Sequence, residues 1–252
     1  MDPSMYRAFA ELHERRHWWF VGRRRIVASI LASVLGDRRN LEILDIGCGT
    51  GGMIPLLRPF GRVTAIDPSE EAILYSSERY SGQAILRRVD FPREPPPRER
   101  YDLVTLFDVL EHLDDDREAL SKAARLLGPG GRLILTVPAH RSLWSPHDEI
   151  NQHRRRYARA ELQGRIREAG LRLLRMTYFN ALLLPAVWAA RRIRRGAALE
   201  GDRRSDFRIQ TGWMNNFLAA VFGAERFLLR AFDLPLGVSL LAIAAPGEPA
   251  VR

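Results

Sequence analysis

A short glycine-rich stretch, ILDIGCGTGG, carries residues suited to binding a cofactor. Its pattern predicts a strand, a tight turn and a helix, and Gly47, Gly49 and Gly51 would let the backbone turn and approach a ligand. Gly52 completes a match to the dinucleotide pattern G-x-G-x-x-G. Asp67 follows Gly47 by 20 residues, where a carboxylate can accept both ribose hydroxyls. These residues predict a nucleotide-like cofactor and leave NAD open.

Carboxylates at the ends of the expected strands narrow the choice of cofactor. Asp45 lies two residues before Gly47, where a negative charge would not help to bind a pyrophosphate. It favours a cationic ligand group, or it braces the glycine loop. Asp67, Asp90 and Asp108 follow the second, third and fourth strands, so we expect them along the crevice where open α/β sheets bind ligands.

The segment after the fifth expected strand, residues 137–162, is rich in side chains that can transfer protons. We expect this segment on the substrate side of the sheet, with His147 or His153 as a general base. Tyr157 is a further catalytic candidate, and the arginines at 154–156 would bind an anionic part of the substrate.

Other interpretations of the polar residues stay open. Tyr157 and one histidine can instead dock the segment on the domain, with the arginines in solvent. His147, Asp148 and His153 are also metal-ligand types, although we expect no metal. The aromatic cluster at residues 17–20 either covers the active site as a lid or packs on the domain as an apolar helix face.

Alternating apolar and helical segments predict the scaffold for these residues. The apolar runs have the length and composition of strands buried on both faces of a sheet. Such alternation is typical of an α/β doubly wound sheet. The expected strands are residues 41–46, 62–67, 83–89, 102–107, 132–138, 171–179 and 237–246, with helices at 69–80, from 115 to a stop at Gly128 and Pro129, and at 158–171.

Three parts are expected along the chain. Residues 1–40 form a helical extension, residues 41–179 and 237–246 form the cofactor-binding domain, and residues 180–236 form a helical insertion. Ten uncharged residues in the insertion, 181–190, span about 15 Å as a helix, which is half of a bilayer's hydrocarbon core. A membrane span is therefore not expected.

Four arginines follow this uncharged run, a composition suited to the surface of an anionic membrane. We expect the insertion to cover the substrate pocket and to touch a membrane or a lipid-like substrate. The alternative is that it packs only on the domain or forms a dimer. The four residues are Arg191, Arg192, Arg194 and Arg195.

Composition sets broad limits on the protein. The 252 residues carry a formal net charge of +9, which suits an anionic partner but also reflects an arginine-rich composition. A single cysteine, Cys48, excludes an internal disulfide framework. The N-terminus has no apolar core of a secretory signal, so we expect a cytoplasmic protein.

Several ordered motifs together point to one family. The stretches ILDIGCGTGG, AIDPS, VDF, FDVLEHL and LLGPGGRLILTVP resemble the class I S-adenosylmethionine-dependent methyltransferases, across about residues 41–175. The small-molecule branch, with the ubiquinone and menaquinone methyltransferases, is the most similar. The resemblance implies a Rossmann-like sheet of seven strands whose last strand is antiparallel.

The resemblance also implies roles for individual residues. Asp45 would lie near the cofactor's amino group, Asp67 would hold the ribose, and Asp90 would accept from the adenine amino group. The implied cofactor-binding residues are Asp45, Gly47, Cys48, Gly49, Asp67, Pro68, Asp90, Phe91, Phe107, Asp108 and His112.

We therefore expect methyl transfer from S-adenosylmethionine to a small acceptor, which is lipid-linked, isoprenoid or glycosylated. An RNA methyltransferase is the first alternative, but no N-P-P-[YFW] motif follows the fourth strand and no separate RNA-binding module is visible. A cofactor-binding scaffold at the membrane is the second. We expect no nucleic-acid partner, and the oligomeric state stays open.

Overall fold

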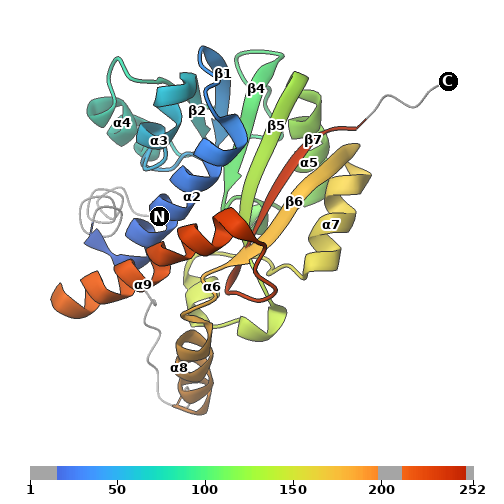
Figure 1. The fold of residues 1–252 in the computed structure, drawn as a ribbon. Helices are drawn as coiled ribbons and strands as arrows, with labels where there is room; N and C mark the ends of the chain where they lie inside the picture. The colour runs from blue at the N-terminus through green and yellow to red at the C-terminus, as the bar shows by residue number, and fades with distance from the viewer. Residues whose placement is uncertain (1–15, 198–211, 248–252) are drawn as a thin grey trace.

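The computed structural model describes residues 16–197 and 212–247, so residues 1–15 of the expected extension and 198–211 of the insertion lie outside the described residues. A seven-stranded sheet with strand order β3-β2-β1-β4-β5-β7-β6 forms the centre (Figure 1). The last strand, β7, is antiparallel to both of its neighbours, β5 and β6. The expected Rossmann-like α/β fold is confirmed. The strands are β1 Leu41–Ile46, β2 Gly61–Asp67, β3 Ile85–Arg88, β4 Tyr101–Phe107, β5 Leu127–Pro138, β6 Leu171–Phe179 and β7 Ser239–Pro246.

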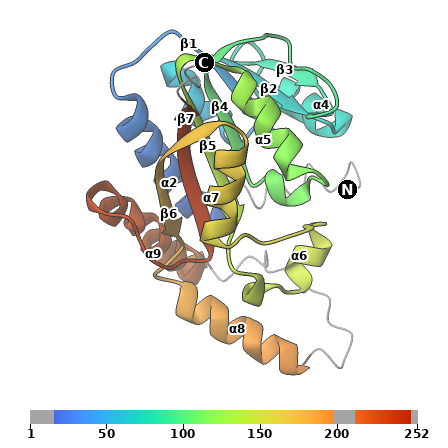
Figure 2. The ribbon, with the colours of Figure 1, turned by 90° about the vertical axis from the view of Figure 1, so that its right-hand side faces the viewer.

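Helices cover both faces of the sheet. In Figures 1 and 2, α2 and α9 lie on one face, and α5 and α7 lie on the other. The Ser69 side chain accepts from the Ala72 amide at 3.2 Å and caps α4, as its sequence position predicts. The α-helices are α2 Trp18–Leu35, α3 Ile54–Leu57, α4 Glu70–Arg79, α5 Asp116–Arg125, α6 Pro146–Ile150, α7 Arg159–Glu168, α8 Leu184–Ala197 and α9 Gly212–Ala231, and the 3-10 helices are η2 Arg58–Phe60, η3 Leu110–His112 and η4 Arg141–Leu143.

The start of β5 differs from its expected bounds. The strand begins at Leu127, which pairs with Tyr101, whereas the sequence pattern predicts a start at residue 132. A register shift between Tyr101 and Leu103, together with the positive φ of Gly130, accommodates the irregular residues between the two pairing regions. Gly128 and Pro129, expected to end a helix, are thus part of a bulged strand.

Helix α2 and helix α9, almost 200 residues apart in sequence, pack together on the sheet. The Trp18 amide donates to Asn215 Oδ1 at 2.8 Å, and Asn215 Nδ2 donates to the Arg16 carbonyl at 2.6 Å. A Cβ on Gly22 would lie 2.5 Å from Phe222 Cδ1, so the two helices approach closely. Helices α2 and α9, which belong to the expected extension and insertion, therefore form one cover on this face of the sheet.

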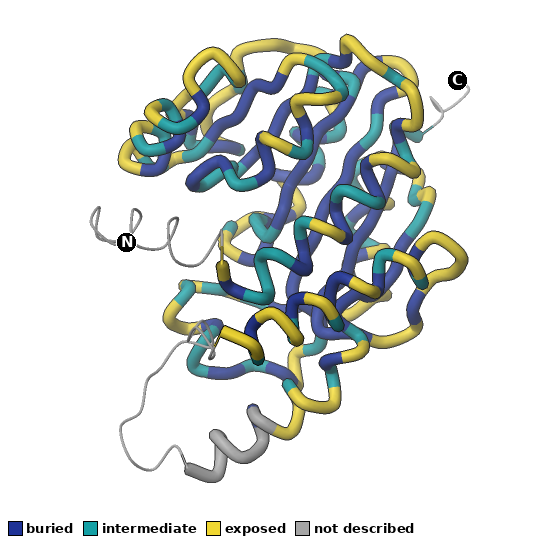
Figure 3. The backbone as a smooth tube through the Cα atoms, turned by 60° about the vertical axis from the view of Figure 1, so that its left-hand side comes forward, coloured by how far each residue is buried: buried dark blue, intermediate teal, exposed yellow. Residues whose placement is uncertain are grey.

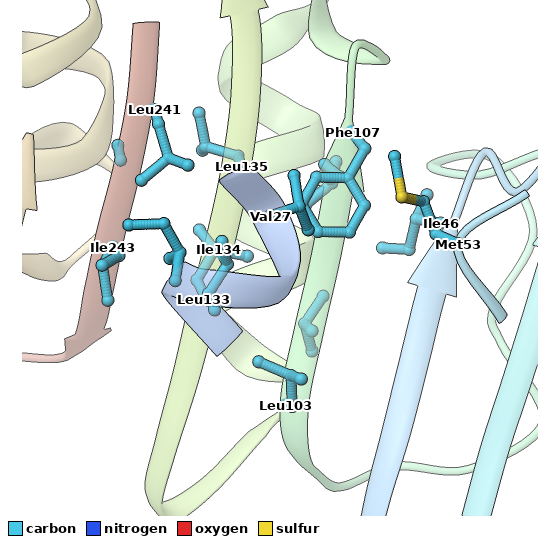
Figure 4. Close-up of a cluster of buried hydrophobic side chains, with 14 of the residues drawn as sticks. Val27, Ile46, Met53, Leu103, Phe107, Leu133, Ile134, Leu135, Leu241 and Ile243 are labelled. Atoms are coloured by element: carbon cyan, nitrogen blue, oxygen red, sulfur yellow. The ribbon is translucent and has the colours of Figure 1, made fainter. Parts of the chain in front are cut away.

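The inner face of this cover belongs to the hydrophobic core. Val27 of α2 lies among side chains of β4 and β5, including Leu133 and Leu135 (Figure 4). The central strands are buried along most of their length, whereas the loops are largely exposed (Figure 3). Among the described residues, no helix combines the length and apolar character needed to cross a bilayer.

Candidate active site

The glycine turn after β1 has a conformation that a larger side chain would disturb. Gly47 has a φ of +68°, and a Cβ there would lie 2.5 Å from Val109 Cγ2. The Gly49 amide donates to Asp67 Oδ2 at 2.8 Å, and the Ser69 amide donates to Asp67 Oδ1 at 2.9 Å. Asp67, at the end of β2, therefore braces the turn from the neighbouring strand.

A cavity of about 250 Å³ lies beside this turn and has a buried carboxylate in its wall. Asp45 is 2% exposed and accepts from Thr105 Oγ1 at 2.7 Å. Burial raises the pKa of Asp45 to about 7, while the Thr105 hydrogen bond and the charge of Arg23 act in the opposite direction. A cationic ligand group would favour the charged form of this carboxylate.

A larger cavity, of about 440 Å³, adjoins the first. Residues of α2, α8 and α9 and of the segment after β5 form its walls. Its volume is typical of sites that enclose a small molecule. Two ligands bound in the two cavities would meet at the four residues that line both, which are Phe20, Arg23, Asp108 and His112.

A buried ion pair joins the cover to the sheet at this junction. Arg23 Nη2 lies 2.5 Å from Asp108 Oδ2, and both groups hydrogen-bond the Thr136 hydroxyl. The guanidinium carbon of Arg23 also lies 5.0 Å from the centre of the Trp19 ring and 5.8 Å from that of Phe107. Arg23 thereby orders one wall of both cavities.

Asp148 organises the polar segment after β5. Its Oδ1 lies 2.9 Å from His153 Nδ1 and accepts from Arg156 Nε at 2.7 Å, and its Oδ2 accepts from the Ser145 amide. Burial acts to raise the pKa of Asp148, but the hydrogen bonds from His153 and Arg156 and the charge of Arg156 outweigh it and hold the pKa well below its usual range. The segment is therefore anchored on a charged carboxylate.

Comparison with known proteins agrees with this geometry. The family model described as a methyltransferase domain matches residues 15–175, more than half of the chain. The chain belongs to this methyltransferase family. It is 31% identical over 129 residues to an uncharacterized methyltransferase of Geobacillus kaustophilus, covering 50% of this chain and 60% of that protein.

The methyltransferase is also similar to proteins that are named for their activity. It is 37% identical over 103 residues to a ubiquinone biosynthesis O-methyltransferase of Bradyrhizobium diazoefficiens, covering 39% of this chain and 40% of that protein. The match thus spans about half the length of these curated relatives.

A solved structure also supports the fold. The crystal structure of a SAM-dependent methyltransferase from Aquifex aeolicus superposes with a TM-score of 0.55 at 20% identity, covering 71% of this chain and 93% of that chain. The resemblance to S-adenosylmethionine-dependent methyltransferases is confirmed, and S-adenosylmethionine is the cofactor that these relatives indicate.

The smaller cavity of the methyltransferase fits the methionine part of this cofactor. Asp45 offers a buried carboxylate to a cationic amino group, and the glycine turn leaves room for a ligand beside the backbone. Each Asp67 carboxylate oxygen accepts one amide hydrogen bond. Because a carboxylate oxygen has two lone pairs, Asp67 can still accept hydrogen bonds from the ribose hydroxyls. The expected residues that line this cavity are Asp45, Gly47, Cys48, Gly49, Phe107, Asp108 and His112.

Four other expected cofactor residues do not line either cavity. Asp67 is the last residue of β2, and Pro68 follows it. Asp90 follows β3, and its carboxylate accepts from Arg93 Nη1 at 3.1 Å. Phe91 is buried and joins Pro92 through a cis peptide bond. The ribose and adenine roles of these residues stay predictions.

Of the three catalytic candidates, the structure brings two to the larger cavity. His147 and His153 both line it and stay candidates for the general base. For Tyr157 the structure favours the docking alternative, because its side chain is fully buried and lines neither cavity. Its hydroxyl donates to Asp116 Oδ2 at 2.8 Å and burial raises its pKa, so Tyr157 docks the segment.

Only one of the three consecutive arginines reaches the cavity. Arg156 lines it, whereas Arg154 pairs with Asp114 and Arg155 pairs with Asp116. The expectation that all three bind an anionic part of the substrate is therefore corrected to Arg156 alone. The aromatic cluster at residues 17–20 lines the larger cavity, and its Trp18 and Trp19 also pack against the core, so both interpretations of the cluster stay open.

Sequence reasoning missed two charged residues of the site. Arg23 lies in the N-terminal extension, where no strand end marks it as functional. Glu111 is fully buried beside the cavity, and burial and the charge of Asp108 raise its pKa well above the usual range. Its neighbour His112 has a pKa lowered to about 4 by burial and by His153. The stretch FDVLEHL contains this signal, since an acid and a histidine directly follow an expected strand end.

Proposed function

We propose that this protein transfers a methyl group from S-adenosylmethionine to a small molecule in the larger cavity. The observation that carries the proposal is the junction of the two cavities at Phe20, Arg23, Asp108 and His112. A methionine part beside Asp45 and an acceptor in the larger cavity would place the reacting atoms at this junction. The sulfonium methyl is already activated, so the protein mainly aligns the acceptor and excludes water.

The lining of the larger cavity supports an acceptor with an apolar body and an anionic or polar end. Trp18, Leu183 and Val187 supply apolar surface, and the guanidinium groups of Arg156 and Arg191 supply positive charge. The expectation of a membrane-surface position for Arg191 is thereby corrected, because its side chain is buried at this cavity. His147 or His153 would take the proton of a hydroxyl acceptor. A walled cavity of this volume favours a small molecule over a folded RNA.

The experiment measures cofactor binding and methyl transfer separately. Titration calorimetry should show that S-adenosylmethionine binds the purified chain. Release of S-adenosylhomocysteine should then be detected with some members of a panel of phenols, quinols, glycosides and isoprenoid-linked compounds. Transfer to RNA alone would favour the RNA alternative, and binding without any transfer would favour a non-catalytic role.

We further propose that the outer face of α9 contacts an anionic membrane that holds a lipid-linked acceptor. At about 100° per residue, Trp213, Phe217 and Phe227 lie within an arc of about 80°. They are 70%, 57% and 56% exposed, respectively. Trp188 on α8 is 52% exposed, and α8 and α9 both lie in the lower part of the molecule in Figures 1 and 2. Exposed aromatic side chains on an amphipathic helix suit the membrane interface.

Vesicle sedimentation tests this contact. The protein should pellet with vesicles of phosphatidylglycerol and phosphatidylcholine, and much less with phosphatidylcholine alone. The double variant Trp213→Ser and Phe217→Ser should lose most of this binding. Leu74→Ser, on the equally exposed Leu74 of α4, is the matched control. Equal recovery in the supernatant with and without anionic lipid would refute the contact.

A further inference from the structure

Three potential metal ligands meet at the edge of the larger cavity. One carboxylate oxygen of Glu111 and one imidazole nitrogen each of His112 and His153 all lie within 4.8 Å of one another. Arg154 holds the two segments together, because its amide donates to the Glu111 carbonyl at 2.8 Å and its Nε donates to the His112 carbonyl at 3.0 Å. The cluster is therefore built into the contact between η3 and the segment after β5.

The Glu111 carboxylate lacks the partners that a buried group normally has. Its side chain is fully buried, and no other residue in the described part of the chain donates a hydrogen bond to either oxygen. Arg23 and Arg156 act on it through their charge but donate no hydrogen bond to it. A carboxylate buried in this way is costly, and a bound cation would offset that cost.

The histidines are oriented as metal ligands usually are. His153 Nδ1 lies 2.9 Å from Asp148 Oδ1, which leaves Nε2 of the neutral ring with a free lone pair. The Asp148 carboxylate is itself fixed by Arg156 and Ser145. The His112 ring hydrogen-bonds the backbone of Gln152. Such partners behind a histidine set its tautomer and ring orientation at metal sites.

We propose that Glu111, His112 and His153 bind one divalent transition-metal ion. Two imidazoles and one carboxylate form a ligand set that leaves coordination positions open. All three residues line the larger cavity, and His112 also lines the smaller one, so an open position would face the junction.

This position gives the ion a role that rests on the proposed function. A hydroxyl oxygen of the acceptor would bind the ion and release its proton to solvent or to His147. That oxygen would then form the bond to the methyl carbon, while the carbon–sulfur bond breaks and its electron pair stays on sulfur. Metal binding itself does not depend on this role.

Cobalt is the probe of choice, because Co²⁺ bound by nitrogen and oxygen ligands absorbs visible light. Chelator-treated protein should bind one equivalent of Co²⁺ and show a visible absorption band. Added Zn²⁺ should displace the Co²⁺ and abolish this band. The variants Glu111→Gln and His153→Gln should weaken binding at least about tenfold. His147→Gln, in the same cavity but outside the cluster, should bind as the wild type does.

The outcomes separate the metal site from the proposed function. Proton NMR of the wild-type Co²⁺ complex should show paramagnetically shifted N–H signals from two histidines. This measurement identifies the histidine ligands even if a variant fails to fold. Absence of Co²⁺ binding, with S-adenosylmethionine binding intact, would overturn the metal site alone. Metal binding without methyl transfer to any acceptor would count against the proposed function alone.

Discussion

Asp45 occupies a buried position whose surroundings act on its charge in opposite directions. Burial and the charge of Asp67 favour the neutral acid, whereas the Thr105 hydroxyl and Arg23 favour the carboxylate. With a pKa of about 7, Asp45 is divided between both forms near neutral pH. An ammonium group of the cofactor would stabilise the charged carboxylate further.

Affinity for S-adenosylmethionine should therefore increase with pH. Binding to the charged form requires Asp45 to lose its proton, while an α-amino group, with a usual pKa of about 7.7–8.0, stays mostly charged up to pH 7. Affinity should therefore rise about fivefold between pH 6 and pH 7. Titration calorimetry across this range measures the effect. Asp45→Asn should bind weakly with a flat profile, and Asp37→Asn, at an exposed position, should keep the wild-type profile. A wild-type profile without any slope would contradict this role.

The same group should affect the stability of the free protein with the opposite sign. The pKa of Asp45 is about 7 in the folded state, above its unfolded value of 3.8, so the folded state binds the proton more tightly. Its contribution is fully present below about pH 4 and is lost as the pH rises through 7. Urea unfolding without cofactor measures the effect. The free energy of unfolding should differ less between pH 5 and pH 8 for Asp45→Asn than for the wild type.

Some residues of the site could be predicted because their positions follow from strand ends. Asp45, the glycine turn and Asp108 belong to neighbouring parallel strands whose carboxyl ends meet at one edge. Tyr157 could not be placed, since its direction depends on Asp116, 41 residues away. Arg23 depends on an ion pair with Asp108 across an even longer interval. Spacing along the chain carries no information on such partners.

At the scale of elements, the contact between α2 and α9 is the feature most sensitive to a small change. Gly22→Ala should destabilise the protein by about 1–3 kcal/mol, because the added carbon overlaps the Phe222 ring at the helix contact. Chemical denaturation measures this. Gly164→Ala on α7 is the matched control, since nothing lies near its Cβ and alanine favours a helix by about 0.5–1 kcal/mol. Equal effects of the two substitutions would contradict the close contact.

Most elements could be predicted from periodicity, although their assembly could not. The expected strand at 171–179 agrees with β6, and the helical insertion expected at 180–236 contains α8 and α9. The pairing of α9 with α2 depends on the Asn215 hydrogen bonds and on the absence of a side chain at Gly22. No local sequence pattern indicates this pairing. The early start of β5 follows from pairing with Tyr101 and not from apolar alternation.

At the scale of the molecule, the cover and the sheet share one core and should unfold together. Thermal unfolding should show a single transition, because Val27 of α2 and Phe222 of α9 are both part of that core. S-adenosylmethionine at 100 times its Kd should stabilise the protein by about 2.7 kcal/mol, which raises the Tm by roughly 5–10 °C. Differential scanning calorimetry measures both. A separate early transition would show that the cover unfolds independently.

The position of β7 in the sheet also has a consequence for the order of events during synthesis. The strand inserts between β5 and β6, with Leu133 opposite Ala244, yet it is the last of the seven strands to leave the ribosome. Strands β1 to β5, with the glycine turn and Asp45, emerge more than 100 residues earlier. The half that binds the cofactor can therefore form while translation continues, whereas the acceptor cavity is completed only after residue 246 has been added.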